Sequence, residues 1–412
     1  MAEPFGPEGL ALEQARAQIL AALQPLGGSE KLPLGACLGR VSSAAVLARE
    51  AVPGFRASTM DGYAIAAEAS PAPGSRWTLV GGSAPGAPFS ARLGPGQAIR
   101  ILTGAPLPEG SGRVLPQELV ELGGDGLLVL LREGGANPWI RQPNDEAAPG
   151  QELLAAGQRL GPADLGRLAS CGLDAIAVTR RPRLGLLISG DELLPPGVPR
   201  GPGQIWESNG TLVAALLQRL GYPVAIQRVV ADQPDQLRQA LLELAQDCDG
   251  VISTGGVSVG DKDWIRPLVE ELGSVRFWKL HLKPGRPFAW GEVAGKPFFG
   301  LPGNPVAAAI TALQLLWPAL QQLEGGQVQL LPRLRVRLEA PLRRGSGRPE
   351  LARAQLVIGP EGELLARLSG SQASARIGSL QGADLLLELP AELESLEAGQ
   401  ELWAQLLRLS IF

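Results

Sequence analysis

A chain of 412 residues, 45% of them hydrophobic and 19% charged, is long and apolar enough to build roughly two to four globular domains. Its formal net charge of −4 implies no general basic surface for nucleic acid. Three widely spaced cysteines predict reduced thiols in a reducing compartment. The single histidine, His281, argues against a structural zinc site and against Ser-His-Asp or Cys-His catalysis.

The N-terminal part of the chain predicts a helix followed by a β domain. Apolar residues recur at helical spacing over 10–23, and the acidic N-terminus lacks the basic region of a secretory signal. Residues 52–64 read VPGFRASTMDGYA, which predicts either a functional polar loop leading into a strand or a plain domain linker. Four apolar runs separated by Gly/Pro turns then predict β structure over 77–131. A further helix is expected over 162–171.

Apolar strands alternate with helices over 183–323, which predicts a parallel sheet with helices on both faces. The first strand runs into SGDEL, which contains Glu192 and could be a simple turn with solvated acids. Ser208 or Asn209 is expected to cap the next helix. Asp232 follows the second strand, where it is expected either to cap the next helix or to contact a ligand.

The third strand runs into the stretch around which the site is organised, VISTGGVSVGDKD over 251–263. Gly255 and Gly256 permit a sharp turn and a close approach of the backbone to a ligand. Ser258 then supplies a hydroxyl and Asp263 a carboxylate, a combination that suits a phosphorylated ligand and its metal. The alternative is an ordinary glycine turn with solvated acids.

Two later loops add cations and helix amides. KLHLKPGRP follows the next apolar run and carries three cations, Lys279, Lys283 and Arg286. GLPGNP opens a long apolar helix with Pro305 near its first turn, and the N-terminus of that helix suits an anion. Because the carboxyl ends of the strands in an open parallel sheet share one crevice, we expect acids, cations and amides to converge there.

The C-terminal part of the chain predicts a small barrel. Short strands with Gly/Pro turns between them and no helices follow Gly326. The segment GRPE contains Arg348, and the segment SGSQASAR contains Ser374; both could be simple loops. The expected strands are 334–338, 354–358, 364–368, 385–389 and 403–409.

Several of these motifs, taken in order, resemble those of the molybdopterin molybdenumtransferases. These are the molybdenum-insertion enzymes of molybdenum cofactor biosynthesis, and they are similar to the E domain of gephyrin. The resemblance rests on PGFRASTMDGYA, TGAPLP, SGDEL, STGGVSVGDKD, KLHLKPGRP and GLPGNP. It covers nearly the whole chain and is weak over 112–122, where a proline interrupts the family's VVMQE, and over 138–150, where charges are lost.

The resemblance implies a multidomain fold of α/β and β type, with a central parallel α/β sheet domain of molybdopterin-binding type. The expected domains are an N-terminal helical/linker domain at 1–50 and 138–180, a mostly β domain with the MDGYA loop at 51–137, the α/β domain at 181–326 and a C-terminal β-barrel at 327–412.

The resemblance also implies the activity: molybdenum from molybdate is inserted into adenylylated molybdopterin, AMP is released, and Mg²⁺ takes part. Catalytic roles carry over to Asp61, Thr103, Glu192 and Asp263, and the three carboxylates among them are the expected metal ligands. Substrate-binding roles carry over to a larger set: Gly255, Gly256, Ser258, Asp232, Lys279, Lys283, Arg286, Gly303, Asn304, Pro305, Arg348 and Ser374.

The expected assembly is a homodimer that shares its active sites between subunits, since the family is dimeric in this way and the linkers near Val52 and Arg180 are short. Contact with the molybdopterin adenylyltransferase is a possible further interaction. We expect a cytoplasmic protein that binds neither nucleic acid nor membrane.

Two other functions remain open. A molybdopterin adenylyltransferase, which activates molybdopterin with ATP, shares the TGGVS-type strand end, but the added β domains and the MDGYA motif argue against it. A non-catalytic gephyrin-like scaffold is the second alternative, and the intact acids Asp61, Glu192 and Asp263 argue against it. A dinucleotide-binding site is not predicted, because GGVSVG at 255–260 does not match the GxGxxG motif.

Overall fold

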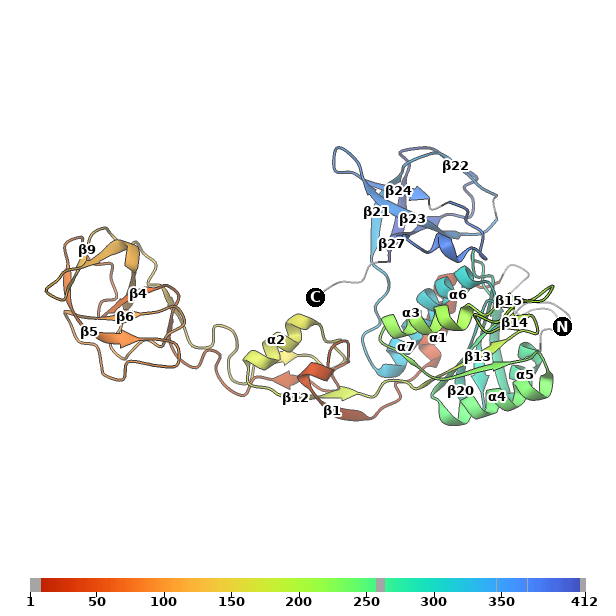
Figure 1. The fold of residues 1–412 in the computed structure, drawn as a ribbon, viewed down its shortest axis with the longest axis horizontal. Coiled ribbons are helices and arrows are strands. Elements are labelled where there is room, and N and C mark those ends of the chain that lie inside the picture. Colours follow the sequence, from red (N-terminus) through yellow and green to blue (C-terminus); the bar gives the residue numbers. More distant parts are fainter. Residues whose placement is uncertain (1–8, 257–263, 346, 369, 408–412) are drawn as a thin grey trace.

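The structure is a computed structural model that describes residues 9–256, 264–345, 347–368 and 370–407. The chain forms an elongated molecule in which a β unit lies at one end and an α/β unit at the other (Figure 1). A small linker unit lies between them, and a barrel packs beside the α/β unit. The chain passes through the linker unit twice, on its way to the β unit and on its return.

The β unit contains a six-stranded sheet with the order β7-β4-β6-β5-β9-β8. Its predicted run 114–122 is divided by the 3₁₀ turn η2 (Gln117–Leu119), which directly follows Pro116. A short ribbon of β3 and β10 leads the chain into and out of the unit. The strands are β3 (Ala57–Ser58), β4 (Gly62–Ile65), β5 (Arg76–Ser83), β6 (Gln97–Ile101), β7 (Arg113–Pro116), β8 (Val120–Leu122), β9 (Leu127–Leu130) and β10 (Ile140–Arg141).

The linker unit is built on two distant segments that pair as antiparallel strands. Strand β1 lies beside β12, and β2 lies beside β11. Cys37 is fully buried in the apolar core beneath α2. The elements are β1 (Ser29–Pro33), η1 (Leu34–Ala36), β2 (Val46–Leu47), β11 (Glu152–Leu154), α2 (Pro162–Ser170) and β12 (Ala175–Thr179).

The α/β unit has a six-stranded sheet with the order β16-β13-β17-β20-β19-β18. Its β-strands are β13 (Leu184–Ser189), β16 (Val224–Val230), β17 (Gly250–Thr254), β18 (Gly273–Lys279), β19 (Pro287–Val293) and β20 (Lys296–Leu301), with a short pair β14 (Leu193–Leu194) and β15 (Ile205–Trp206) outside the sheet. The helices are α1 (Leu12–Ala22), α3 (Asn209–Arg219), α4 (Pro234–Asp247), α5 (Ile265–Leu272), α6 (Pro305–Thr311), the π-helical segment η3 (Ala312–Leu316) and α7 (Trp317–Glu324).

The expectation of a purely parallel sheet is wrong for one strand. Strand β19 was not predicted, and it pairs antiparallel with both β18 and β20. The remaining pairs, β16 with β13, β13 with β17 and β17 with β20, are parallel as expected. Because β18 and β20 run in the same direction on either side of β19, the carboxyl end of β18 still lies at the same edge of the sheet as the other four.

Two layers of helices cover the sheet as the alternation predicted. Helices α4 and α5 pack on one face, where Leu241 and Ile265 meet Leu187. Helices α1, α3, α6 and α7 pack on the other, where Leu217 meets Leu186. The segment Pro305–Glu324 is the one helix among the described residues that is long and apolar enough to cross a membrane, but 89% of its apolar window is buried inside the protein, as expected of a core helix.

The start of α3 differs from the expected cap. Neither Ser208 nor Asn209 makes a side-chain capping bond. Instead Glu207 Oε1 accepts the N–H of Gly210 at 2.6 Å. Asn209 points elsewhere, since its Nδ2 donates to the carbonyl oxygen of Gly303 at 2.8 Å.

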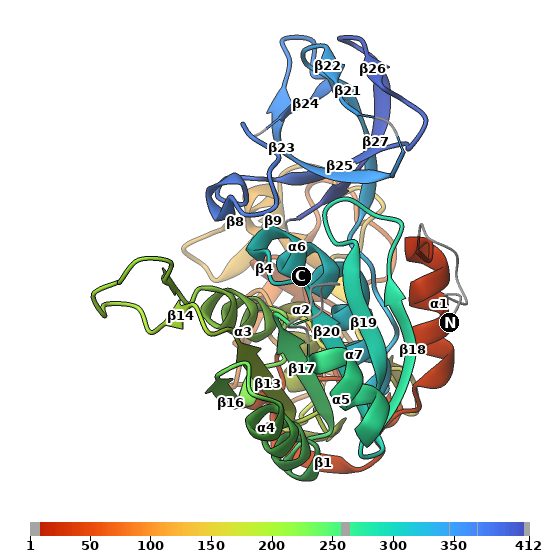
Figure 2. The same cartoon turned by 90° about the vertical axis from the view of Figure 1, so that its right-hand side faces the viewer.

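The C-terminal unit is a closed barrel with the order β21-β24-β23-β25-β27, and its strands are the five predicted. Figure 2 shows the barrel above the sheet, close to α6 and the upper end of β19. The barrel strands are β21 (Arg333–Leu338), β23 (Glu350–Ile358), β24 (Leu364–Leu368), β25 (Leu385–Leu389) and β27 (Glu401–Leu406). A small ribbon, β22 (Leu342–Arg343) with β26 (Ser395–Leu396), and the turn η4 (Ile377–Ser379) complete the unit.

Candidate functional site

The carboxyl edge of the α/β sheet gathers acids from two strand ends. Asp191 and Glu192 follow β13, and Asp232 follows β16, its immediate neighbour in the sheet. The backbone N–H of Asp232 donates to Asp191 Oδ1 at 3.0 Å. Since Gln233 is the N-cap residue of α4, Asp232 is not the helix cap that was one of its two expected roles.

The pKa of Asp232 is raised above its ordinary value. Partial burial is the main cause, and the negative charges of Asp191 and Glu192 add to it, while a hydrogen bond from Ser189 opposes the shift. The three carboxylates therefore repel one another across the edge of the sheet. A cation or a hydrogen-bond donor brought to this edge would relieve that repulsion.

The glycine turn after β17 is required by packing. Gly255 and Gly256 have φ angles of +84° and +62°, in the left-handed region. A Cβ on Gly255 would lie 2.7 Å from the carbonyl oxygen of Ser189, and one on Gly256 would lie 2.5 Å from Ile265 Cγ1. A Cβ on Gly303 would lie 3.7 Å from Gly255 Cα, so the GLPGNP loop lies against this turn.

A cavity of about 560 Å³ lies between the α/β unit and the barrel. Three cations, Lys283, Arg286 and Arg348, line it, and none of the described residues in its wall is acidic. This arrangement suits an oxyanion, because charged donors make the strongest hydrogen bonds to anions. The wall is formed by Lys283, Pro284, Gly285, Arg286, Pro287, Pro302, Asn304, Ala307, Arg348, Gln372, Ala373 and Ser374.

Backbone hydrogen bonds hold the two sides of this cavity together. The N–H of Val306, in the first turn of α6, donates to the carbonyl oxygen of Ser374 at 3.1 Å. This amide is therefore bonded to the barrel loop and is not among the free amides that the helix start was expected to offer to an anion. Arg348 Nη1 donates to the carbonyl oxygen of Leu282 at 3.3 Å, which ties the barrel to the KPGRP turn.

The cavity unites Lys283, Arg286, Asn304, Arg348 and Ser374, five of the predicted site residues. The other predicted residues of these loops, Lys279, Gly303 and Pro305, do not line it. The carbonyl oxygen of Lys279, the last residue of β18, accepts the N–H of Leu10 at 3.0 Å. Ser258 and Asp263 lie outside the described residues.

Asp61 and Thr103, each predicted as a catalytic residue, meet in the β unit. Asp61 Oδ1 accepts the backbone N–H of Thr103 at 2.7 Å and its hydroxyl at 2.8 Å. These bonds, the backbone one first, hold the pKa of Asp61 below its ordinary value, and the charge of Arg100 adds to the effect. Both residues are exposed, so this carboxylate faces outward and is ionised.

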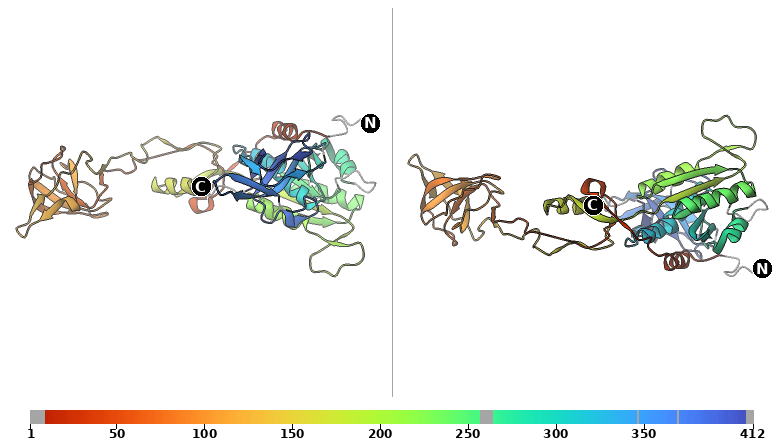
Figure 3. Two further views of the ribbon diagram at one scale, coloured as in Figure 1. Left: turned by 90° about the horizontal axis from the view of Figure 1, so that it is seen from above. Right: turned by 90° about the horizontal axis from the view of Figure 1, so that it is seen from below.

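Within one chain the Asp61 pair is far from the sheet edge. It belongs to the β unit, which lies at the opposite end of the molecule from the α/β unit in the views of Figures 1 and 3. Asp61 and Glu192, expected to share a metal, are thus not neighbours in one chain. Within the part of the chain that the structure describes, no group of three or more His, Cys, Asp or Glu side chains could hold a metal ion.

Several residues at these places were not predicted. Asp191 directly precedes Glu192, and Gln372 and Ala373 directly precede Ser374. Their position beside residues that match family motifs is the feature of the sequence that could have identified them. Arg100 carries no motif, although its guanidinium lies 5.0 Å from the ring centre of Tyr63 and bonds to the carbonyl oxygen of Gly62.

Three family models match the chain in the order of its units. The MoeA N-terminal region (domain I and II) matches residues 10–172, a probable molybdopterin binding domain matches residues 185–322, and the MoeA C-terminal region (domain IV) matches residues 335–407. The chain is 32% identical to the molybdopterin molybdenumtransferase of Haemophilus influenzae, over 95% of this chain and 97% of that one. It belongs to the molybdopterin molybdenumtransferase family.

Other relatives agree with this family. The molybdopterin molybdenumtransferase of Bacillus subtilis is 32% identical over 93% of this chain and 91% of its own length. Gephyrin of Dictyostelium discoideum is 28% identical over 90% of this chain, which spans 58% of that longer protein. A crystal structure of a molybdopterin biosynthesis MoeA protein from a Pyrococcus species has a TM-score of 0.77 at 28% identity, covering 97% of this chain and 99% of that one. The predicted fold class is confirmed, apart from the antiparallel strand β19.

Proposed function

We propose that the protein inserts molybdenum from molybdate into adenylylated molybdopterin, with release of AMP, and so forms molybdenum cofactor. The observation that carries the proposal is the cavity in which Lys283, Arg286 and Arg348 meet the Ser374 loop. Molybdate is a small tetrahedral dianion, and cations with hydroxyl and amide donors bind such an anion. Relatives named molybdopterin molybdenumtransferases match nearly the whole chain and support the same reaction.

We place the adenylylated pterin along the glycine-lined edge next to this cavity. Turns with positive φ and no side chains let phosphate groups approach the backbone, and Gly255 and Gly256 form such a turn. Gly303 lies against this turn, and Asn304, the next residue, lines the cavity. Molybdate in the cavity would therefore lie beside the pterin, so that metal insertion and cleavage of the bond to AMP take place at neighbouring positions.

We also propose Mg²⁺ as the metal of this site. Mg²⁺ is usually held by one or two carboxylates, water and substrate phosphates, so a pair of acids at the sheet edge is a suitable donor set. Glu192 and Asp232 are such a pair, and the raised pKa of Asp232 reflects a local excess of negative charge as well as burial. Bound there, Mg²⁺ would supply the positive charge that polarises a phosphoanhydride. Asp263 and the Asp61 of a second subunit complete the proposed set of Mg²⁺ ligands.

The test of the activity is turnover of adenylylated molybdopterin with and without molybdate. We expect AMP release to depend on molybdate, and the double variant Lys283→Ala/Arg286→Ala to require far more molybdate while still binding the pterin. An adenylyltransferase would instead consume ATP and molybdopterin, and a scaffold would do neither. A molybdate requirement that does not change in the double variant would show that the cavity is not the anion site.

We further propose that the active protein is a homodimer in which Asp61 and Thr103 of one subunit complete the site of the other. The supporting observation is the separation of this pair from the sheet edge of its own chain (Figure 1), and a two-fold dimer forms both sites at once. Co-expressed Asp61→Ala and Asp232→Ala chains, each inactive alone, should regain part of the activity. Mixed dimers with no activity would refute shared sites. Contact with the adenylyltransferase and a cytoplasmic location stay predictions.

A further inference from the structure

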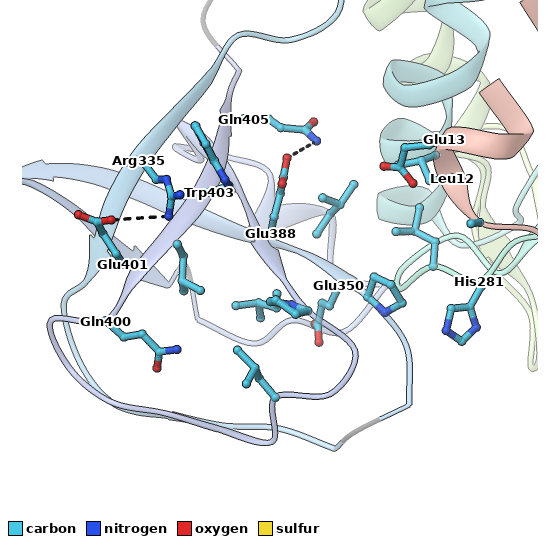
Figure 4. A pocket seen from close by; sticks show the side chains of 18 residues that line it. Leu12, Glu13, His281, Arg335, Glu350, Glu388, Gln400, Glu401, Trp403 and Gln405 are labelled. Atoms are coloured by element: carbon cyan, nitrogen blue, oxygen red, sulfur yellow. Dashed lines mark hydrogen bonds and ion pairs between the residues drawn. The ribbon is translucent and has the colours of Figure 1, made fainter. Parts of the chain in front are cut away.

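A buried carboxylate, Glu350, lies where the barrel meets the α/β unit. Its side chain is 3% exposed, and its Oε2 is 3.1 Å from Lys283 Nζ and 3.3 Å from Arg344 Nε. Figure 4 shows it between the barrel and the segment that carries His281. Burying a carboxylate costs free energy unless the group is paired and hydrogen-bonded, so the two cations around Glu350 account for its presence in this position.

We propose that Glu350 is a positioning residue of the oxyanion cavity, because its carboxylate holds the Lys283 ammonium at the cavity wall. The inference rests on the proposed function. Lys283 lines this cavity, whereas Glu350 lines a separate one between the barrel and α1. Glu350 therefore does not line the oxyanion cavity itself, and it acts on a bound anion only through Lys283.

Backbone bonds fix the main chain around Lys283 but leave its side chain to be placed. The N–H of Lys283 donates to the carbonyl oxygen of Pro349 at 2.9 Å, and the N–H of Leu351 donates to the carbonyl oxygen of Lys283 at 2.8 Å. The Lys283 side chain is 45% exposed, and a lysine of this kind has many rotamers to lose on ordering. The contact with Glu350 selects one of them.

The barrel side of the contact is rigid. Arg344 is 5% exposed, and its guanidinium donates to the carbonyl oxygens of Pro390, at 2.6 Å, and of Arg348. The Glu350 carboxylate is thus fixed by a buried arginine that is itself anchored, and it can hold the more mobile lysine. The same arginine donates to the backbone of Arg348 and pairs with Glu350, which in turn contacts Lys283. Arg344 and Glu350 together therefore connect two of the cations that line the cavity.

The positioning role and a simple count of charges predict opposite results. Replacing Glu350 with glutamine removes one negative charge near the cavity, so charge counting predicts tighter binding of molybdate. If Glu350 positions Lys283, the same replacement releases the ammonium, and molybdate binds more weakly. Residues in direct contact have coupling energies equivalent to changes of severalfold or more in affinity.

The experiment is a double-mutant cycle on the full-length protein, read as the molybdate dependence of AMP release. We expect Glu350→Gln to raise the KM for molybdate about tenfold with a smaller change in kcat, and Lys283→Met to do the same. Added to Lys283→Met, Glu350→Gln should change the KM by less than about twofold. Calorimetric titration with molybdate alone should give the same pattern without turnover.

Two further variants separate positioning from folding. Glu339→Gln removes a barrel carboxylate that pairs with Arg367 away from the cavity, and it should leave the KM unchanged. Glu350→Asp keeps the charge with a shorter reach, and it should raise the KM less than glutamine does even if the glutamine variant folds poorly.

Three results would overturn the role of Glu350: an unchanged KM, a lower KM, or effects of Glu350→Gln and Lys283→Met that add. If Lys283→Met itself leaves the KM unchanged, the proposed anion site fails as well, which distinguishes the two failures.

Discussion

A buried ion cluster joins the linker unit to the α/β unit, and its loss should weaken that junction. Glu324, at the end of α7, has a side chain with no exposed surface. Its Oε2 accepts Arg159 Nη2 of the linker unit at 2.8 Å and the Tyr222 hydroxyl at 2.7 Å. Arg159 Nη1 also donates to the carbonyl oxygen of Gly39 at 2.7 Å. The Glu324→Gln substitution keeps the volume of the side chain and removes its charge.

The expected cost follows from the burial of the partners. Removing one member of a buried ion pair costs about 3–5 kcal/mol, and a hydrogen bond to a charged group contributes about 1.5–3 kcal/mol. Because the glutamine amide oxygen can still accept one bond and the Arg159 side chain is 21% exposed, we expect a loss of about 3 kcal/mol. Arg181, whose Nε lies 3.8 Å from Glu324 Oε1, would also lose its nearest negative charge.

The measurement is urea unfolding followed by far-UV circular dichroism, with limited proteolysis to detect opening between the linker and α/β units. A multidomain chain need not unfold in one step, so the transition that contains the junction is the one to compare. The control is Glu243→Gln, which removes an exposed pair with Arg228 at 4.0 Å and should change stability by less than about 1 kcal/mol. An equal and small effect of both substitutions would refute the reasoning.

Three further predictions concern titrating groups. Thr103→Val should raise the pKa of Asp61 towards 3.8, because it removes the hydroxyl donor that helps to lower it; carboxyl ¹³C NMR measures this shift. Burial is the main reason that the pKa of Tyr222 is raised above 10.0, so its contribution to stability is complete below pH 10 and is lost above it. The advantage of the wild type over Tyr222→Phe in urea unfolding should therefore shrink by about 1.4 kcal/mol per pH unit above pH 10. Because the raised pKa of Asp232 lets protons compete with a cation, the dissociation constant for Mg²⁺ in calorimetric titration should rise as pH falls, and less so in Asp232→Asn.

The fold was predictable where hydrophobic periodicity and turn residues agree. The strand Val224–Val230 was predicted to the residue, and the five barrel strands were found within a few residues at each end. Strand β19 was missed because its first residue, Pro287, is the last residue of the KPGRP turn and its apolar run, 288–290, is only three residues long. Its antiparallel course depends on pairing with β18 and β20, which are distant contacts that local patterns do not specify.

The site was predictable as a set of motifs but not as a geometry. The positions of Lys283 and Ser374 in one cavity depend on how the barrel docks on the sheet, which no local pattern encodes. The same docking commits the N–H of Val306 to the Ser374 carbonyl oxygen, although the sequence suggested a helix start open to an anion. Glu350 lies within the matched GRPE segment, yet its role depends on Lys283, which is 67 residues away in the chain.

The contacts of the linker unit help to decide whether Asp61 and Thr103 reach the sheet edge of their own chain or that of a second chain. Folding back at the junction between the linker and α/β units would require the contacts of Arg159, Tyr222 and Glu324 to open, which would leave a buried carboxylate without its cation. The closed junction instead supports the β unit at a distance from its own α/β unit, as Figure 1 shows. A second chain related by two-fold symmetry places no such demand on the junction. This difference in cost favours the shared-site dimer that we propose over a rearranged monomer.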